Sequence, residues 1–202
     1  PARKRPKPGE RRVQILQALA TMLEQPGAER VTTAALAARL EVSEAALYRH
    51  FASKAQMFEG LIEFIEHTVF ALLNQIVPPG DAVPAASADT GVRQAGRVVG
   101  VVLQFAEKNP GMARVMVGDA LVFENERLQQ RMNQFFDRVE STLRQCLRAA
   151  AQSAGSDTPT MDAQVRAAVL TAFVMGRLQR FTRSGFRRVP SEHLDASLAL
   201  ML

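Results

Sequence analysis

Helical periodicity along nearly the whole chain restricts this sequence to an all-α fold. Apolar residues recur every three to four positions, as in Ile15, Leu19 and Leu23 near the start of the chain. This spacing places the side chains on one face of an α-helix. Alternating runs of β-branched residues between hairpin turns, which would predict strands, are absent from the sequence. We therefore expect about nine helices.

Helix-breaking and helix-capping residues divide the pattern into segments. Pro26-Gly27 ends the first helix, and Ser53 is placed to cap a long one. Three prolines and many small residues in 77–91 predict a loop. The predicted helices cover residues 10–25, 33–40, 44–50, 53–76, 92–108, 112–117, 120–151, 161–183 and 191–202.

Residues 32–51 have the pattern of a helix-turn-helix. Thr32 and Ser43 each precede a short helix as an N-cap, and residues 40–42 turn the chain between the two helices. Two short helices packed at a steep angle present the second one to a major groove. On a helical wheel, the second helix places Glu44, Ala45, Tyr48 and Arg49 on one side, and Ala46, Leu47 and His50 on the other.

The first of these two sides is the predicted DNA-reading face. Arg49 would donate to a guanine edge or a phosphate, and Tyr48 would donate its hydroxyl to a phosphate. Ala45 is small enough to contact a thymine methyl, whereas Glu44 must accept from a cytosine amino group or point away. His50 either contacts the DNA backbone or packs at the helix end. The predicted DNA-contacting residues are Arg11, Thr32, Thr33, Ser43, Glu44, Ala45, Tyr48, Arg49, His50 and Lys54.

The net positive charge of the chain is concentrated at its N-terminus. Lysine and arginine number 25 against 20 aspartate and glutamate, a net charge of +5, and the same excess arises within residues 1–12 alone. A basic arm of this kind is typical of proteins that bind nucleic acid, and the alternative is a solvated tail.

Residues 42–54 resemble the recognition helix and following turn of the TetR family of bacterial regulators. Segments in the C-terminal part, which usually diverges within the family, resemble one subgroup, the nucleoid occlusion factors. These segments are residues 63–66, 109–111, 119–124, 127–129 and 133–134. The family usually has glycine where this chain has Glu41, and often proline where it has Ala52. If residue 41 needs a positive φ, glutamate costs roughly 1 kcal/mol there.

The resemblance implies a TetR-like architecture in three parts. A basic flexible arm covers residues 1–9, and a helix-turn-helix DNA-binding domain covers residues 10–54. Residues 55–202, with the loop 77–91, form a C-terminal helical domain for dimerisation and partner binding.

A partner-binding surface is also implied. Met57, Phe64 and Ala71 form an apolar line on the helix 53–76, and the residues alone favour a second core face over an exposed anchor. Nucleoid occlusion factors of this family are expected to bind the C-terminal tail of the cell-division protein FtsZ in a groove beside this helix. The resemblance assigns to that groove Phe64, Val101, Gln104, Lys108 and Asn109. The chain departs from the subgroup at Leu72 and Gln104, where arginine and glycine are expected.

Two features of the helix 161–183 have alternative interpretations. Ala168, Ala172 and Gly176 recur every four residues and allow close helix packing, either inside the domain or at a dimer interface, which the resemblance supports. The arginines that follow favour a solvated face over a second DNA site. They are Arg177, Arg180, Arg183, Arg187 and Arg188.

No catalytic or metal-binding pattern accompanies these features. His50, His67 and His193 are scattered and lack metal-ligand spacing, and no glycine-rich phosphate loop or nucleophile elbow is present. Cys146 adjoins an apolar stripe and is expected to pack. No apolar run reaches the ~18 residues that a membrane span needs. We expect a cytoplasmic, nucleoid-associated protein that is not an enzyme and needs no cofactor or metal.

The resemblance implies a homodimer that binds palindromic chromosomal sites in double-stranded DNA, with several dimers per site, and that antagonises FtsZ assembly. The alternative is a ligand-responsive TetR-type transcriptional repressor with an apolar small molecule in its C-terminal core. An open groove near Phe64 favours the first and a closed pocket favours the second. A weaker third hypothesis is an architectural nucleoid protein that binds DNA without sequence preference.

Overall fold

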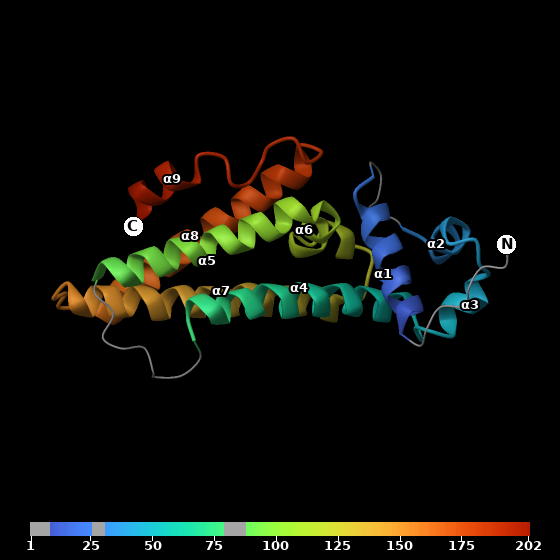
Figure 1. Ribbon diagram of the computed structural model, residues 1–202, viewed down its shortest axis with the longest axis horizontal. Helices are drawn as coiled ribbons and strands as arrows, with labels where there is room; N and C mark the ends of the chain where they lie inside the picture. The colour runs from blue at the N-terminus through green and yellow to red at the C-terminus, as the bar shows by residue number, and fades with distance from the viewer. Residues whose placement is uncertain (1–8, 26–30, 79–87) are drawn as a thin grey trace.

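The computed structural model describes residues 9–25, 31–78 and 88–202, and these residues form helices and no strand (Figure 1). The predicted all-α fold is confirmed. The nine α-helices of the described residues are α1 (Glu10–Leu23), α2 (Thr33–Arg39), α3 (Glu44–Tyr48), α4 (Lys54–Ile76), α5 (Ala88–Lys108), α6 (Pro110–Met116), α7 (Glu126–Ser153), α8 (Pro159–Arg183) and α9 (Leu194–Met201). A 3-10 turn, η2 (Asp119–Leu121), precedes α7. Residues 1–8, Pro26-Gly27 and most of the loop 77–91 lie outside the described residues.

Three predicted helix starts are wrong by three or more residues. Helix α5 begins at Ala88, inside the predicted loop 77–91, instead of at residue 92. The other two have local reasons. The helix predicted over 120–151 begins only at Glu126, because η2 comes first and Asn125 then caps α7 by accepting a hydrogen bond from the N–H of Arg127 at 2.9 Å. The last helix begins at Leu194 instead of residue 191, because His193 has a φ of 53° and interrupts the helical geometry.

The helices form a small head and an elongated body (Figure 1). Helices α1, α2 and α3 gather at one end of the molecule, and α4 leads from them into a body in which α5, α7 and α8 pack together. Side chains of α4, α5, α7 and α8 supply most of the continuous hydrophobic core. The head and the body therefore share one helix, α4.

Close backbone approach holds the head against the body. A Cβ atom on Gly111 of α6 would overlap the carbonyl oxygen of Ala20 in α1. A Cβ on Gly60 of α4 would already lie 3.0 Å from the Leu16 side chain of α1. The glycine in the segment 109–111 is therefore required by the contact between α1 and α6, because any side chain there would push the two helices apart.

Helix α4 buries an apolar seam from Phe58 to Ile76, but Leu72 within that stretch is 40% exposed. Phe70 is buried instead, with its ring 5.4 Å from that of Phe135 and the guanidinium of Arg138 3.7 Å from its centroid. Helix α7 thus covers the side of α4 that carries Phe70 and leaves Leu72 at the surface.

Ion pairs fix α4 along α7. Arg131 donates two hydrogen bonds to the Glu66 carboxylate, at 3.2 and 2.6 Å, and Arg127 pairs with Glu59. The hydrogen bond to Glu66 raises the pKa of Arg131. A bidentate pair of this kind fixes orientation as well as distance, so α4 cannot rotate freely on α7.

Cys146 is buried on α7, as predicted, and its environment should make it unreactive. Burial disfavours the thiolate and raises the pKa of Cys146 to about 11. Because the folded-state pKa lies above the usual thiol value of about 8.5, this group's contribution to stability is complete below pH 8.5. It is lost as the pH rises towards 11.

We expect very slow labelling of Cys146 by a thiol reagent at pH 8, because the side chain is buried, and fast labelling after denaturation. Fast labelling of the folded protein would contradict burial.

Candidate nucleic-acid interface and partner groove

Two N-caps build the predicted helix-turn-helix. The Thr32 hydroxyl accepts a hydrogen bond from the N–H of Ala35 at 3.1 Å, and the Ser43 hydroxyl accepts one from the N–H of Ala46 at 3.2 Å. Leu36 and Leu47 are both 1% exposed and pack in the core. Each cap uses a lone pair of its hydroxyl, so the hydroxyl protons remain available to an external acceptor such as a phosphate.

The turn between α2 and α3 is a Schellman motif with a left-handed glutamate. The N–H of Glu41 donates to the carbonyl of Ala38 at 3.1 Å, and the N–H of Val42 donates to that of Ala37 at 3.0 Å. Glu41 has a φ of 54°, in the region that favours glycine. The positive φ considered from the sequence is therefore present.

Helix α3 exposes the four residues that the helical wheel places on its outer side. Glu44, Ala45, Tyr48 and Arg49 are exposed, whereas Leu47 is buried. Tyr48 keeps 46% of its surface exposed although it is a large aromatic residue. The Arg49 side chain has no partner among the described residues, which leaves its guanidinium free to donate.

Glu44 is turned towards α2. The Thr33 hydroxyl donates to its Oε2 atom at 2.6 Å, so this bond connects the two short helices. The hydroxyl proton of Thr33 is therefore used in a hydrogen bond within the protein. Of the two alternatives for Glu44, the structure favours the one in which the carboxylate is held back.

Two basic side chains at this end of the molecule have structural partners. Arg12 donates to the carbonyl oxygen of His50, and its guanidinium stacks 4.1 Å from the Phe51 ring centroid. Lys54 forms a 2.5 Å ion pair with Glu124, which lies between η2 and α7. Neither pairing could be predicted from the sequence, because the partners are far apart in the chain.

Arg11 and His50 are less exposed than the α3 face. Arg11 is half-buried and donates to the Gln14 side chain at 3.0 Å. His50 is half-buried and its carbonyl accepts the bond from Arg12, which favours packing at the helix end.

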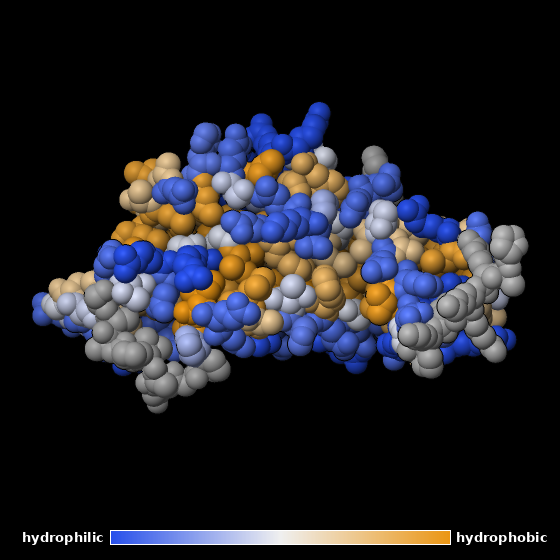
Figure 2. All heavy atoms as spheres, viewed as in Figure 1, coloured by the Kyte–Doolittle hydropathy of each residue, from blue (hydrophilic) through white to orange (hydrophobic). Residues whose placement is uncertain are grey.

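Phe64 lies at the surface, so the core position favoured by the sequence alone is wrong. It is 47% exposed, whereas Met57 on the same line is fully buried. The Phe64 ring lies 6.1 Å from the buried ring of Phe105 in α5, which supports one side of it and leaves the other open. Figure 2 shows apolar side chains gathered over α4 and α5 on the side of the molecule seen in Figure 1.

An open groove of about 510 Å³ runs along α5 beside these residues. Val101 and Gln104 of α5 line it, together with Ile76 of α4 and Leu198 of α9. Its lining combines apolar side chains with two arginines, one aspartate and one glutamine. The lining residues are Ile76, Arg93, Gly96, Arg97, Gly100, Val101, Gln104, Leu194, Asp195 and Leu198.

Of the five residues predicted for the partner groove, Val101 and Gln104 line this groove, whereas Phe64, Lys108 and Asn109 lie outside its lining. Gln104 and Lys108 are exposed on α5, and Val101 is half-buried. Asn109 differs, because its amide donates to the Phe105 carbonyl at 2.8 Å and so ends α5. Leu194 and Leu198 of α9 also line the groove and were not predicted to do so, although their four-residue spacing predicts a shared helix face.

One side of α8 is apolar and exposed. Ala168, Ala172 and Gly176 all face outwards, so the interpretation as internal packing is wrong. A Cβ atom on Gly176 would meet nothing within 4 Å. The other large apolar residues exposed on α8 are Met161, Val165, Val169 and Met175.

No helix in the described ranges is long and apolar enough to span a membrane. Within the same ranges, no three His, Cys, Asp or Glu side chains are grouped so that they could hold a metal ion.

The sequence matches two family models. Residues 15–61 match the bacterial regulatory proteins of the tetR family, and residues 89–202 match the SlmA-like type of the tetracyclin repressor-like C-terminal domain. The chain is 48% identical over 192 residues to the nucleoid occlusion factor SlmA of Vibrio cholerae serotype O1, covering 95% of this chain and 93% of that one. It is 50% identical over 186 residues to the SlmA of Photobacterium profundum, covering 92% and 90%.

Solved structures share the fold at low sequence identity. The TetR-family transcriptional regulator PfmR from Thermus thermophilus has a TM-score of 0.72 at 20% identity, covering 94% of this chain and 97% of that chain. The regulator FadR from Bacillus subtilis, solved with stearoyl-CoA, has a TM-score of 0.69 at 14% identity, covering 94% and 96%.

The left-handed Glu41 gives a stability prediction. Glu41→Gly should stabilise the head by up to about 1 kcal/mol, because glycine avoids the clash of a Cβ at positive φ but has more freedom to lose on folding. Glu41→Val should destabilise it by more than about 1 kcal/mol, since a β-branched residue fits this region worst. Chemical denaturation of both variants measures the difference. Equal stability of the two would contradict the left-handed geometry.

Proposed function

The chain belongs to the TetR family, in its group of nucleoid occlusion factors SlmA, and we propose that it is a homodimeric nucleoid occlusion factor. It binds palindromic chromosomal sites in double-stranded DNA and engages FtsZ over the nucleoid, where it blocks assembly of the division ring. It is a DNA-binding regulator and not an enzyme, and it acts on the nucleoid in the cytoplasm. The observation that carries the proposal is the exposed α3 face together with a partner groove on the body of the same chain.

The DNA-binding domain is residues 10–54, preceded by the basic arm 1–9. Arg49 and Tyr48 supply the base and phosphate contacts, with Ala45 between them at the closest approach. The capping hydroxyls of Thr32 and Ser43 donate their free protons to phosphates. Two copies of α3 about one helical turn apart, near 34 Å, would read a palindrome.

Lys54 can contact DNA only if its ion pair with Glu124 breaks. The side chain of Glu124 is 9% exposed, so the ion pair is partly shielded from water. A phosphate that attracted Lys54 would weaken a contact between the head and the segment before α7. Helix α4 runs unbroken from Lys54 past Phe64, so a change at the head reaches the groove. DNA would in this way act as the ligand that activates the FtsZ surface.

The body, residues 55–202, provides the FtsZ surface. An exposed aromatic ring beside a groove that is mainly apolar and carries two arginines and one aspartate suits a tail that mixes apolar and charged residues. Phe64 is the anchor, and Val101, Gln104, Lys108 and Asn109 complete the surface assigned from the family. The arginine expected at position 72 is Leu72, and its exposure enlarges the apolar part of the surface.

The outward face of α8 is the proposed dimer interface. Small residues at four-residue spacing allow two helices to approach closely, and Ala168, Ala172 and Gly176 provide that spacing beside larger apolar side chains. Burial of this face against a second copy removes an apolar surface from water.

Observations on the body favour this proposal over a ligand-responsive repressor. The described part of the core is filled by side chains such as Val98, Phe135 and Leu170, each fully buried. The groove near Phe64 is open to solvent. A small molecule that bound the core and released DNA would favour the repressor instead.

The function is tested by sedimentation of FtsZ polymers with and without site DNA. The protein with DNA should reduce the amount of FtsZ polymer in the pellet. The variant Phe64→Ala should weaken the affinity for FtsZ by roughly thirtyfold or more, as expected of an aromatic anchor. DNA affinity should be unchanged, because Phe64 lies outside the head.

Val122→Ala is the matched control, because Val122 is an exposed apolar residue away from the groove. This variant should reduce the pelleted polymer as much as the unmodified protein does. Polymer levels that do not respond to DNA with the unmodified protein would refute the mechanism.

The basic arm is tested by salt dependence. If two arms together with Arg49 and Lys54 neutralise about 8 phosphates, log affinity should fall with log salt at a slope near −7. Removal of residues 1–9 should flatten that slope and leave the preferred sequence intact, because the reading face on α3 remains. An unchanged slope would identify the arm as a solvated tail.

A further inference from the structure

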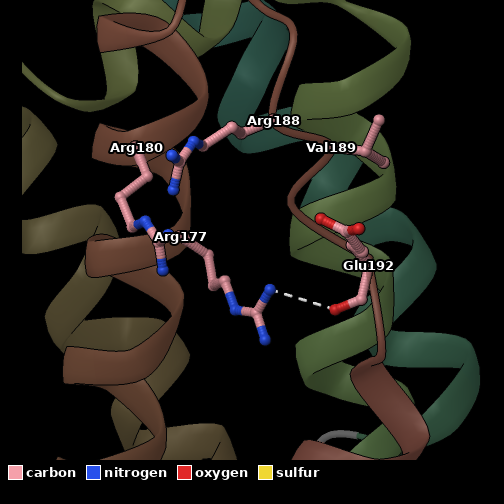
Figure 3. A pocket seen from close by; sticks show the side chains of 5 residues that line it. All are labelled: Arg177, Arg180, Arg188, Val189 and Glu192. Carbon is pink, nitrogen blue, oxygen red and sulfur yellow. Dashed lines mark hydrogen bonds between the residues drawn. The ribbon is translucent and has the colours of Figure 1, made fainter.

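A small cavity lies between the C-terminal half of α8 and the segment that leads to α9. Its volume is about 110 Å³, and it is lined by Arg177, Arg180, Arg188, Val189 and Glu192. Figure 3 shows three guanidinium groups around this space, with those of Arg180 and Arg188 next to each other. The cavity belongs neither to the α3 face nor to the groove along α5.

Arg177 is held in place before any ligand arrives. It donates to the carbonyl oxygen of Glu192 and to the hydroxyl of Ser197, each at 3.0 Å, and its guanidinium lies 4.8 Å from the Phe173 ring centroid. These contacts make Arg177 half-buried, so the interpretation of the whole arginine series as a solvated face is wrong for this residue. A fixed donor costs little further entropy on binding.

A strained turn brings Arg188 back over α8. Phe186 has a φ of 64°, a left-handed conformation that is strained for a bulky residue. Its ring packs 5.1 Å from that of Phe181 and lies under the Arg114 guanidinium at 5.2 Å. The Ser184 hydroxyl accepts from the N–H of Arg188 at 2.9 Å. Strain that the surrounding packing maintains is typical of functional sites.

The charges around the cavity are not balanced. Glu192 is the only carboxylate in the lining, and its recorded ion pair is with His193 at 3.7 Å. In the described part of the chain, the side chains of Arg180 and Arg188 have neither a hydrogen bond nor an ion pair. Adjacent guanidinium groups repel each other, and an anion between them would remove that repulsion.

We propose that Arg177, Arg180 and Arg188 form a binding site for a small phosphate-class anion. Guanidinium groups present paired N–H donors that match the oxygens of a phosphoryl group. The volume holds several water molecules and so accommodates one tetrahedral oxyanion. Because Arg180, Arg188 and Val189 are exposed, the remainder of a larger ligand could extend into solvent.

The site also adjoins the apolar face of α8. Arg180 is the next position in the four-residue series Ala168, Ala172 and Gly176. A carboxylate from a second copy of this chain is therefore the competing occupant. The phosphate-class ligand is favoured because the guanidinium groups of Arg180 and Arg188, unpaired within the described residues, border the cavity beside the fixed Arg177. A single carboxylate, by comparison, accepts one bidentate pair well.

The test is calorimetric titration of the full chain with inorganic pyrophosphate at constant ionic strength, without DNA or FtsZ, so that its outcome is independent of the proposed function. We expect saturable binding at one site per chain. Arg180→Gln and Arg188→Gln should each weaken it at least about tenfold, since each removes charged hydrogen bonds. A nucleoside diphosphate titrated in parallel distinguishes the two possible sources of the phosphate group. Tighter binding than that of pyrophosphate identifies a phosphorylated small molecule as the ligand, and equal binding identifies the free anion.

Arg183→Gln is the matched control, because Arg183 is an exposed arginine of the same helix outside the cavity lining. It should leave binding unchanged. Absence of saturable binding, or an equal loss with Arg183→Gln, would overturn the proposal. A change in dimer dissociation by Arg180→Gln without any anion binding would assign the cluster to the partner copy instead.

Discussion

Burial of the apolar seam of α4 is the interaction on which both proposed binding surfaces depend. This helix begins at Lys54 beside the recognition helix, and its seam is buried as far as Ile76 in the body. The same packing that fixes the helix-turn-helix also sets how far Phe64 stands out from α5. Ion pairs to α7 prevent rotation of α4, so the orientation of the two surfaces is determined together.

Features set by neighbouring residues were predictable from the sequence. The caps at Thr32, Ser43 and Ser53 depend only on the next three residues, and the outer side of α3 depends only on helical spacing. The left-handed turn at Glu41 followed from the glycine that the family has there. These features explain why the fold and the DNA-reading face could be anticipated.

Features set by distant residues could not be predicted in the same way. Phe64 and Phe70 are both aromatic residues of α4, and only the positions of α5 and α7 decide that the first is exposed and the second is buried. The pairs Lys54–Glu124 and Arg12–His50 join segments with no local signal. The arginine cavity likewise depends on a strained turn at Phe186. Phenylalanine rarely adopts a positive φ, so the residue type does not predict this turn.

Selection of bound DNA from a random pool tests the central claim most directly, which is that a symmetric dimer reads DNA through α3. The account predicts an enriched palindrome whose half-sites lie about one helical turn apart. It also predicts that Arg49→Ala relaxes the preference at particular positions and costs about 1–3 kcal/mol. A pool that shows no enriched sequence, or an unpaired half-site, would contradict it.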